Sequence, residues 1–203
     1  MKQTLRIAIL AAFACMALAA LSNSAQAQRM DIAFGISTVD SPAASSVSFT
    51  DTNHSPVSIT GGTYPGFSGD VLFFHNAGIG AEVFWKASQV DYAGQGFNYR
   101  PLFWDVNAVY SPKLASHAYL ELVGGIGAQS ARFYTGTTCG IYNCSNYQSI
   151  NHFDADFGGG IKFYPKGGFF VRPEARFYLI NNNLEFSSNH TTRYGVSIGY
   201  TFR

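Results

Sequence analysis

Charged residues and cysteines are scarce in this chain. Only 12% of its 203 residues are Asp, Glu, Lys or Arg, and the formal net charge is +1. A nearly neutral chain lacks the basic surface that nucleic-acid binding requires, so we expect no nucleic-acid partner. The aromatic content of 16% is too high for a disordered chain, and the length is typical of one domain.

Long apolar runs are also missing, except at the N-terminus. Residues 7–21 form an apolar run of fifteen residues that follows two basic residues and precedes Ala25-Gln26-Ala27. This pattern is typical of a secretory signal peptide. The run is shorter than the ~20 residues that a membrane-spanning helix needs. We therefore predict a signal peptide over residues 1–27 and a mature domain over residues 28–203.

Three cysteines are present, and Cys15 lies in the predicted signal peptide. Cys139 and Cys144 flank a short segment that contains turn-forming Gly and Asn. In an exported protein, two cysteines this close predict a disulfide that closes a small loop. A metal site is the alternative, but no second cysteine pair accompanies them and His152 is the one histidine nearby. We therefore expect no metal.

The mature chain lacks the apolar spacing of amphipathic helices. Apolar residues instead alternate with small or polar ones, which is the period of a β-strand. In the last segment, for example, Tyr194, Val196 and Ile198 fall on one face, and Gly195 and Ser197 on the other. Alternation of this kind predicts eight strands, over residues 30–37, 61–74, 79–87, 100–110, 118–132, 153–164, 169–179 and 194–203.

The connections between these strands alternate in length. Short turns are predicted over residues 75–78, 111–117 and 165–168, and long polar loops over residues 38–60, 88–99, 133–151 and 180–192. Short turns at one end and long loops at the other are typical of barrels that cross an outer membrane. The sequence thus predicts an all-β fold, an eight-stranded antiparallel up-and-down transmembrane β-barrel. We expect a monomer surrounded by lipid in the outer membrane of a Gram-negative-type bacterium.

Charged residues fall almost entirely on one face of the predicted strands. A soluble, lipocalin-like barrel would show the same alternation with its apolar face inside, but such a protein needs a more highly charged exterior. If the apolar face contacts lipid, the charges lie inside the barrel, where they must pair. The predicted interior charge network comprises Glu82, Lys86, Asp105, Glu121, Asp154, Asp156, Lys162, Arg172, Glu174 and Arg176.

Two stretches carry a resemblance to a known family, namely Gly78–Val83 and the closing strand Tyr194–Arg203. Together with the signal peptide and the alternation, they make the chain similar to the small outer-membrane β-barrels of the OmpA-like and OmpX-like type. The resemblance implies that the outer-membrane assembly machinery reads a C-terminal signal, here Tyr200 and Phe202. The family pattern has a terminal aromatic residue, whereas here the aromatic is penultimate.

The resemblance also raises the question of catalysis, because some related barrels modify lipid A. Such enzymes need a serine, a histidine and a carboxylate. The nearest arrangement is His152 beside Asp154, with Ser145 and Ser149 upstream. It lacks the His-x-Ser spacing of the deacylases, so we expect no catalytic residues and no cofactor.

Eight strands enclose a lumen just wide enough for side chains, so free diffusion of metabolites is not expected. The predicted function is therefore a structural or surface-interaction role, in which the long loops either bind an extracellular ligand or form inert polar caps. The alternatives are a narrow ion-conducting channel, gated by exchange of the interior ion pairs, and a lipid A-modifying enzyme.

Overall fold

The structure is a computed structural model. It describes residues 29–42, 58–59, 61–74, 76–92, 96–136, 138–139, 144–181, 184–186 and 188–202, with the backbone alone for residues 138–139, 144–145 and 184. The predicted signal peptide lies outside these residues. No helix in the described ranges is long and apolar enough to span a membrane.

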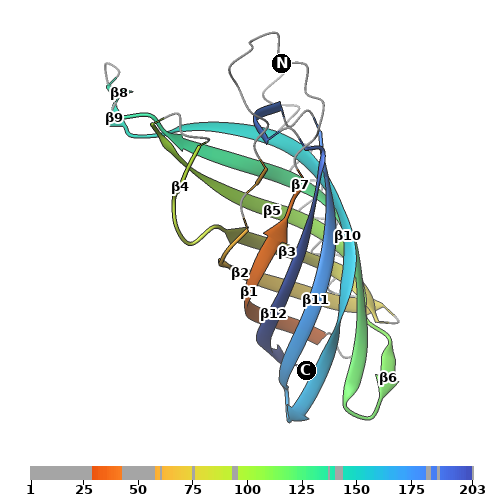
Figure 1. Cartoon of the computed structure of the whole chain (residues 1–203). Helices are drawn as coiled ribbons and strands as arrows, with labels where there is room; N and C mark the ends of the chain where they lie inside the picture. Colours follow the sequence, from red (N-terminus) through yellow and green to blue (C-terminus); the bar gives the residue numbers. More distant parts are fainter. Residues whose placement is uncertain are drawn as a thin grey trace, which may run out of the picture.

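Eight long strands close into a barrel (Figure 1). They are β1 (Arg29–Asp40), β2 (Tyr64–Phe74), β3 (Ala77–Trp85), β5 (Asn98–Tyr110), β7 (Ala118–Tyr134), β10 (Gln148–Lys166), β11 (Phe169–Ile180) and β12 (His190–Phe202). Each pairs antiparallel with the next along the chain, and β1 pairs with β12 to close the sheet. The predicted eight-stranded antiparallel barrel is confirmed.

Small elements occupy the connections. They are β4 (Val90–Asp91), β6 (Lys113–Ala115), β8 (Thr138–Cys139), β9 (Cys144–Ser145) and the 3-10 helix η1 (Leu184–Phe186). The loop predicted over residues 133–151 is too long, because β10 begins at Gln148 and its first residues pair with β7. Polar side chains there hide the apolar alternation, while the backbone ladder continues.

The two ends of the barrel differ. The tight connections β2–β3 and β10–β11 lie at the end where β1 begins and β12 ends, as the pairing of Met30 with Phe202 shows. We call this the short-turn end and the opposite one the long-loop end. In barrels of this type the short turns face the periplasm and the long loops face the exterior.

The outer face is apolar over most of its height. Ile32, Val106 and Val196, for example, are each about half exposed, although a water-facing sheet would carry polar groups there. Aromatic side chains on this face include Phe34, Phe67, Trp104, Tyr110, Phe153, Phe157, Phe163, Phe169, Tyr194, Tyr200 and Phe202. A belt of this kind suits hydrocarbon flanked by aromatic girdles.

The interior is layered. An aromatic cluster fills the long-loop end and contains Val39, Ile59, Tyr64, Phe84, Tyr99, Phe103, Ala131, Phe133, Tyr178, Ile180 and Phe186. Two smaller apolar groups fill the short-turn end, formed by Ala33, Tyr164 and Phe170 and by Leu72, Val109 and Val123. The buried charges lie between these layers.

Inward-facing glycines allow close packing around these charges. A Cβ atom on Gly127 would lie 2.1 Å from the main-chain oxygen of Trp104, and one on Gly158 would lie 2.3 Å from that of Ala175. Both contacts are with backbone, which cannot move aside as a flexible side chain can. Glycine is therefore required at these positions for the strands to approach one another.

Candidate functional site: the charged barrel interior

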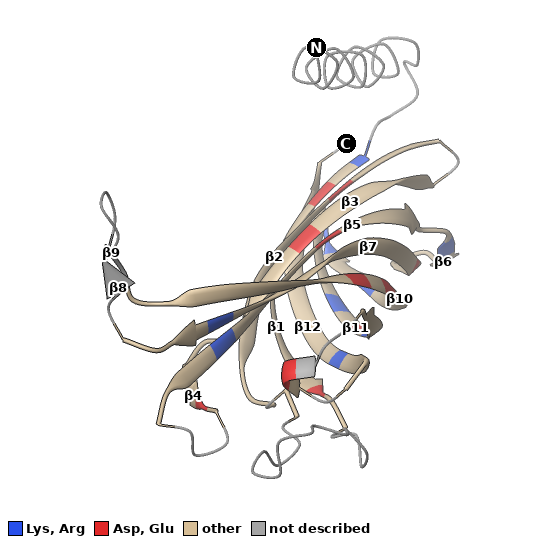
Figure 2. Cartoon of the chain, turned by 90° about the horizontal axis from the view of Figure 1, so that it is seen from above, with Lys and Arg blue, Asp and Glu red and all other residues tan. Residues whose placement is uncertain are grey.

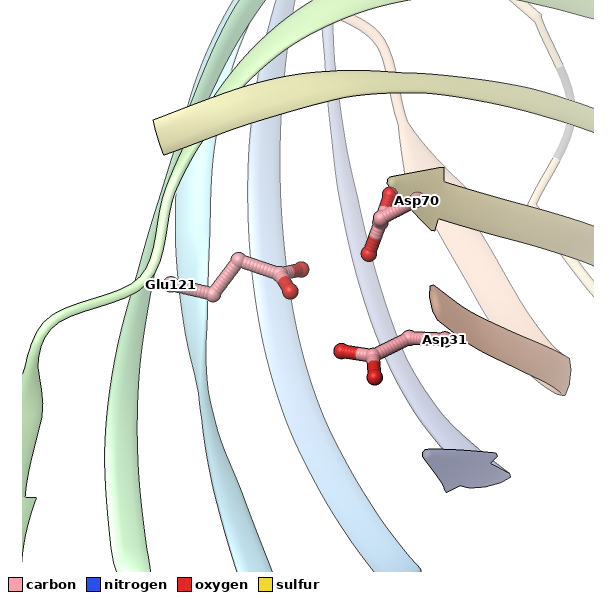
Figure 3. A group of neighbouring side chains, drawn as sticks. All are labelled: Asp31, Asp70 and Glu121. Carbon is pink, nitrogen blue, oxygen red and sulfur yellow. The ribbon is translucent and has the colours of Figure 1, made fainter. Parts of the chain in front are cut away.

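Lys162 on β10 lies among three carboxylates from three other strands. Its ammonium nitrogen is 2.6 Å from Oδ2 of Asp31 and 3.2 Å from Oδ2 of Asp70, and it also contacts Oε2 of Glu121. Figure 3 shows these three carboxylates converging inside the barrel. Their oxygens lie within 4.8 Å of one another, a spacing that suits a cation. In this fold the cation among them is the lysine side chain itself.

Arg172 on β11 extends this group across the barrel. Its Nη1 donates to Oε1 of Glu121 at 2.6 Å, and its Nε lies 2.9 Å from Oε2 of Glu174. Two serine hydroxyls, from Ser68 and Ser197, accept further hydrogen bonds at 2.8 and 3.0 Å. The guanidinium is 1% exposed, so these partners replace the water that it loses on burial.

A second group of charges centres on Glu82. Its carboxylate accepts from Arg193 at 2.5 Å and lies 3.2 Å from Nη2 of Arg176. Arg176 also reaches Asp105 at 3.5 Å and Asp156 at 3.3 Å. Glu82 therefore joins two arginines from β11 and β12, which pair with each other in the sheet.

The two groups form one ionic network, because Glu174 binds both Arg172 and Arg193. Its five cations are Arg29, Lys162, Arg172, Arg176 and Arg193, and its seven carboxylates are Asp31, Asp70, Glu82, Asp105, Glu121, Asp156 and Glu174. Figure 2 shows blue and red segments distributed over the barrel strands. Removing one partner from such a network leaves a buried charge uncompensated.

The structure places all ten residues of the predicted interior set at buried or partly buried inward positions, and eight of them belong to the ionic network. Four further members were missing from that set. Asp31 and Asp70 occupy the polar positions of their strands, so the alternation already contained their signal. Arg193 and Arg29 lie just before the predicted strand starts at residues 194 and 30.

Asp154 and Gln129 differ from the network residues. Both side chains are fully buried, and neither forms a hydrogen bond with any residue that the structure describes. Asp154 lies opposite Gly127, whereas Gln129 lies opposite His152. Asp154 is thus a buried carboxylate without an ion-pair partner in the described barrel. It can therefore be compared with the buried carboxylates of the network that do have ion-pair partners.

Lys86 lies above the network, immediately after the end of β3. Its ammonium group donates to the main-chain oxygen of Gly61 and lies 5.1 Å from the ring centroid of Tyr64. This member of the predicted set therefore belongs to the aromatic layer at the long-loop end.

His152 is a buried strand residue, although the sequence places it at the edge of a loop. Its Nε2 lies 2.8 Å from Oε2 of Glu185, which belongs to η1. The next residue, Phe186, is fully buried in the aromatic cluster. The hydroxyl of Tyr92 donates to the main-chain oxygen of Glu185 at 2.5 Å, and burial together with the Glu185 charge raises the pKa of Tyr92. These contacts hold η1 over the lumen.

The possible catalytic arrangement around His152 is not assembled in the described residues. Ser149 is exposed on the outward face of β10, whereas His152 and Asp154 are buried on its inward face. The carboxylate that contacts His152 belongs to Glu185 rather than Asp154. The side chain of Ser145 lies outside the described part.

Side chains occupy the lumen beside the ionic network. The cavity next to Glu82, Phe84, Arg172 and Arg193 has a volume of about 10 Å³, roughly the room of one water molecule. Phe84, which lines this cavity, contacts Phe103 and Tyr178, and the three ring centroids lie 4.7 to 5.6 Å apart.

Two further predictions are the disulfide in the hairpin and the C-terminal assembly signal. The backbone pairs Cys139 with Cys144 across the β8–β9 hairpin, but their side chains lie outside the description, so the disulfide stays a prediction. Tyr200 and Phe202 lie on the outer face of β12, with ring centroids 4.9 Å apart, and Phe202 pairs with Met30 on β1.

Comparison with known proteins gives matches in structure alone, because no family model and no curated protein matches the chain. Neisserial surface protein A matches with a TM-score of 0.58 and 9% identity over 86% of this chain and 97% of its own. A major outer membrane protein of Thermus thermophilus matches with a TM-score of 0.57 and 8% identity over 87% of this chain and 100% of its own. Ail of Yersinia pestis, in complex with the heparin analogue sucrose octasulfate, matches with a TM-score of 0.53 and 12% identity over 86% and 97%. The closed sheet, its apolar belt and these likenesses together show that the chain has the fold of the small eight-stranded outer-membrane β-barrels.

Proposed function

We propose that this protein is a closed, monomeric outer-membrane barrel that acts through its long-loop end as a surface-interaction protein, without catalysis. The observation that carries the proposal is the filled lumen. An aromatic layer, an ionic network and two apolar groups follow one another along the barrel. With the interior occupied, the surface at the long-loop end is the part available to a partner.

The strands at that end support the same role. β7 has 17 residues and β10 has 19, whereas a membrane strand needs only ~9–11. The excess forms a sheet of β5, β7 and β10 that continues past the rest of the barrel toward β8 and β9 (Figure 1). It displays Tyr134 and Tyr147, whose ring centroids lie 6.0 Å apart. Aromatic side chains on a rigid sheet suit recognition of a partner.

The first ligand class to test is a sulfated glycan, because Ail was solved with a heparin analogue. Vesicles that carry the refolded barrel should be retained on immobilised heparin. A variant with residues 135–147 replaced by a short Gly-Ser turn should lose that retention and keep the heat-dependent gel shift of a folded barrel. Equal retention of both proteins would contradict a role for this hairpin, and lack of retention of either would exclude sulfated glycans.

The closed sheet also supports the monomer and the assembly route that we propose. Pairing of β1 with β12 leaves no free barrel edge to join a second copy. Tyr200 and Phe202, exposed on the outer face of the closing strand, are the proposed signal for the assembly machinery. Replacing both by Ser should lower the amount of barrel in the outer membrane of cells while sparing refolding in detergent.

A narrow ion channel is the second candidate, favoured by one observation. Lys162 and Arg172 both bind Glu121, so a cation could exchange partners across the lumen. If the network is a gate, the purified barrel will show discrete conductance in planar bilayers, and Glu121→Gln will change it. A silent wild-type barrel would support the closed structure.

A further inference from the structure

Two arginines face each other on the outside of the barrel. Arg100 on β5 pairs directly with Arg132 on β7, and both are partly exposed. Side chains alternate between the two faces along each strand, so both arginines lie on the outer face, as do Leu102 and Ser130. Like charges directly opposite each other on neighbouring strands destabilise a sheet unless something compensates them.

Neither guanidinium group has a counter-charge in the described structure. No ion pair joins Arg100 or Arg132 to a carboxylate among the described residues. Arg132 lies over the ring of Tyr147, 5.1 Å from its centroid, which fixes its direction. Its Nε is buried and has no hydrogen-bond partner there. The pair therefore places two positive charges side by side without a counter-charge among the described residues, and Arg132 is held in a fixed direction.

The position of the pair indicates what the acceptor is. The next outward row toward the short-turn end contains Ser130 and Asn151, which are paired. The row after that contains Trp104 and Phe153, which are 48% and 55% exposed and belong to the apolar belt. Two residues of strand, about 7 Å, thus separate Arg100 from the row of Trp85, which pairs with Leu102, and four residues, about 13 Å, separate it from Trp104. This is the level of lipid headgroups on the outer side of the membrane.

We propose that Arg100 and Arg132 bind a phosphate group on the headgroup of an outer-leaflet lipid, whose acyl chains lie along Trp104 and Phe153. Two guanidinium groups offer planar pairs of donors that match phosphate oxygens, and they neutralise its charge. Asn151, which is exposed, adds an amide group between headgroup and tail. Continuity with the apolar belt favours a lipid over free phosphate.

The proposal is tested with the mature barrel in zwitterionic detergent micelles. Bisphosphorylated lipid A and its dephosphorylated form are titrated, and tryptophan fluorescence follows binding because Trp104 lies two rows from the arginines. Wild type should bind the phosphorylated lipid about tenfold more tightly, as charge-assisted hydrogen bonds to one phosphate imply. The double variant Arg100→Gln/Arg132→Gln should lose this preference.

The matched control removes two exposed cations from the short-turn end, Lys113→Gln/Lys166→Gln, and should keep the preference. The heat-dependent gel shift checks folding. If the double arginine variant does not fold, each single variant should bind the phosphorylated lipid about threefold more weakly than wild type. Equal affinity of wild type for the two lipids would overturn the proposal, and so would an equal loss in the lysine control. Displacement of the lipid by inorganic phosphate at a similar concentration would overturn the lipid as its source.

Discussion

Lys162 and Asp31 are separated by 131 positions in the chain, yet their charged groups lie 2.6 Å apart inside the barrel. One residue belongs to β10 and the other to β1, which are not neighbouring strands in the sheet. The contact thus crosses the lumen and forms only when the sheet has closed. The ion pair between Lys162 and Asp31 therefore depends on closure of the barrel.

Lys162→Met should destabilise the barrel by about 3–5 kcal/mol, because Asp31, Asp70 and Glu121 would lose their shared cation in a buried site. The midpoint of urea unfolding in lipid vesicles, followed by the heat-dependent gel shift, measures the change. Lys113→Met is the matched control, since Lys113 is exposed on β6. The same midpoint for both variants would show that the ion pairs contribute nothing.

Two buried carboxylates allow a direct comparison. Glu82→Gln should cost about 3 kcal/mol, because Glu82 is the shared partner of Arg176 and Arg193. Asp154→Asn makes the same chemical change at a carboxylate that has no partner among the described residues, so it should leave stability unchanged or raise it. Urea unfolding of the two variants side by side tests this. A larger loss for Asp154→Asn would be inconsistent with the network as described.

Phe186→Ala should open the long-loop end of the lumen. The ring is fully buried and lies 5.0 Å from that of Tyr99, so its loss should cost about 3–5 kcal/mol. Residues 181–189 should then be cleaved faster by protease added outside intact cells. Phe153→Ala, on the lipid-facing side of β10, serves as the control. Unchanged cleavage in Phe186→Ala would mean that this side chain does not hold η1.

Gly127→Ala should impair folding, because its Cβ would lie 2.1 Å from the main-chain oxygen of Trp104. Overpacking of this kind costs about 3 kcal/mol. Gly124→Ala is the matched control on the same strand, where the nearest atom to a Cβ is 3.7 Å away. Refolding yield in detergent measures both. Equal yields would contradict the close approach of β5 and β7 at Gly127.

Much of the fold follows from alternation alone. The outward position of Ile198 and the inward position of Arg172 both follow from a period of two, because lipid outside and polar groups inside select opposite residue types. The same period assigns Asp31 and Asp70 to the interior. It does not predict the inward position of Arg193, which lies just before the apolar repeat begins. It also does not predict that His152 lies within a strand, because polar neighbours interrupt the apolar repeat there.

The sequence by itself determined that this chain forms an eight-stranded barrel with an apolar exterior. Successive residues of a strand point to opposite faces, so the order of residue types along the chain defines both faces. The tertiary structure alone decided which charges meet. Closure brings Lys162 to Asp31, and strand register sets Arg100 opposite Arg132. The reason is physical: alternation is local in the chain, whereas ion pairing and register depend on distances between strands that a linear pattern does not contain.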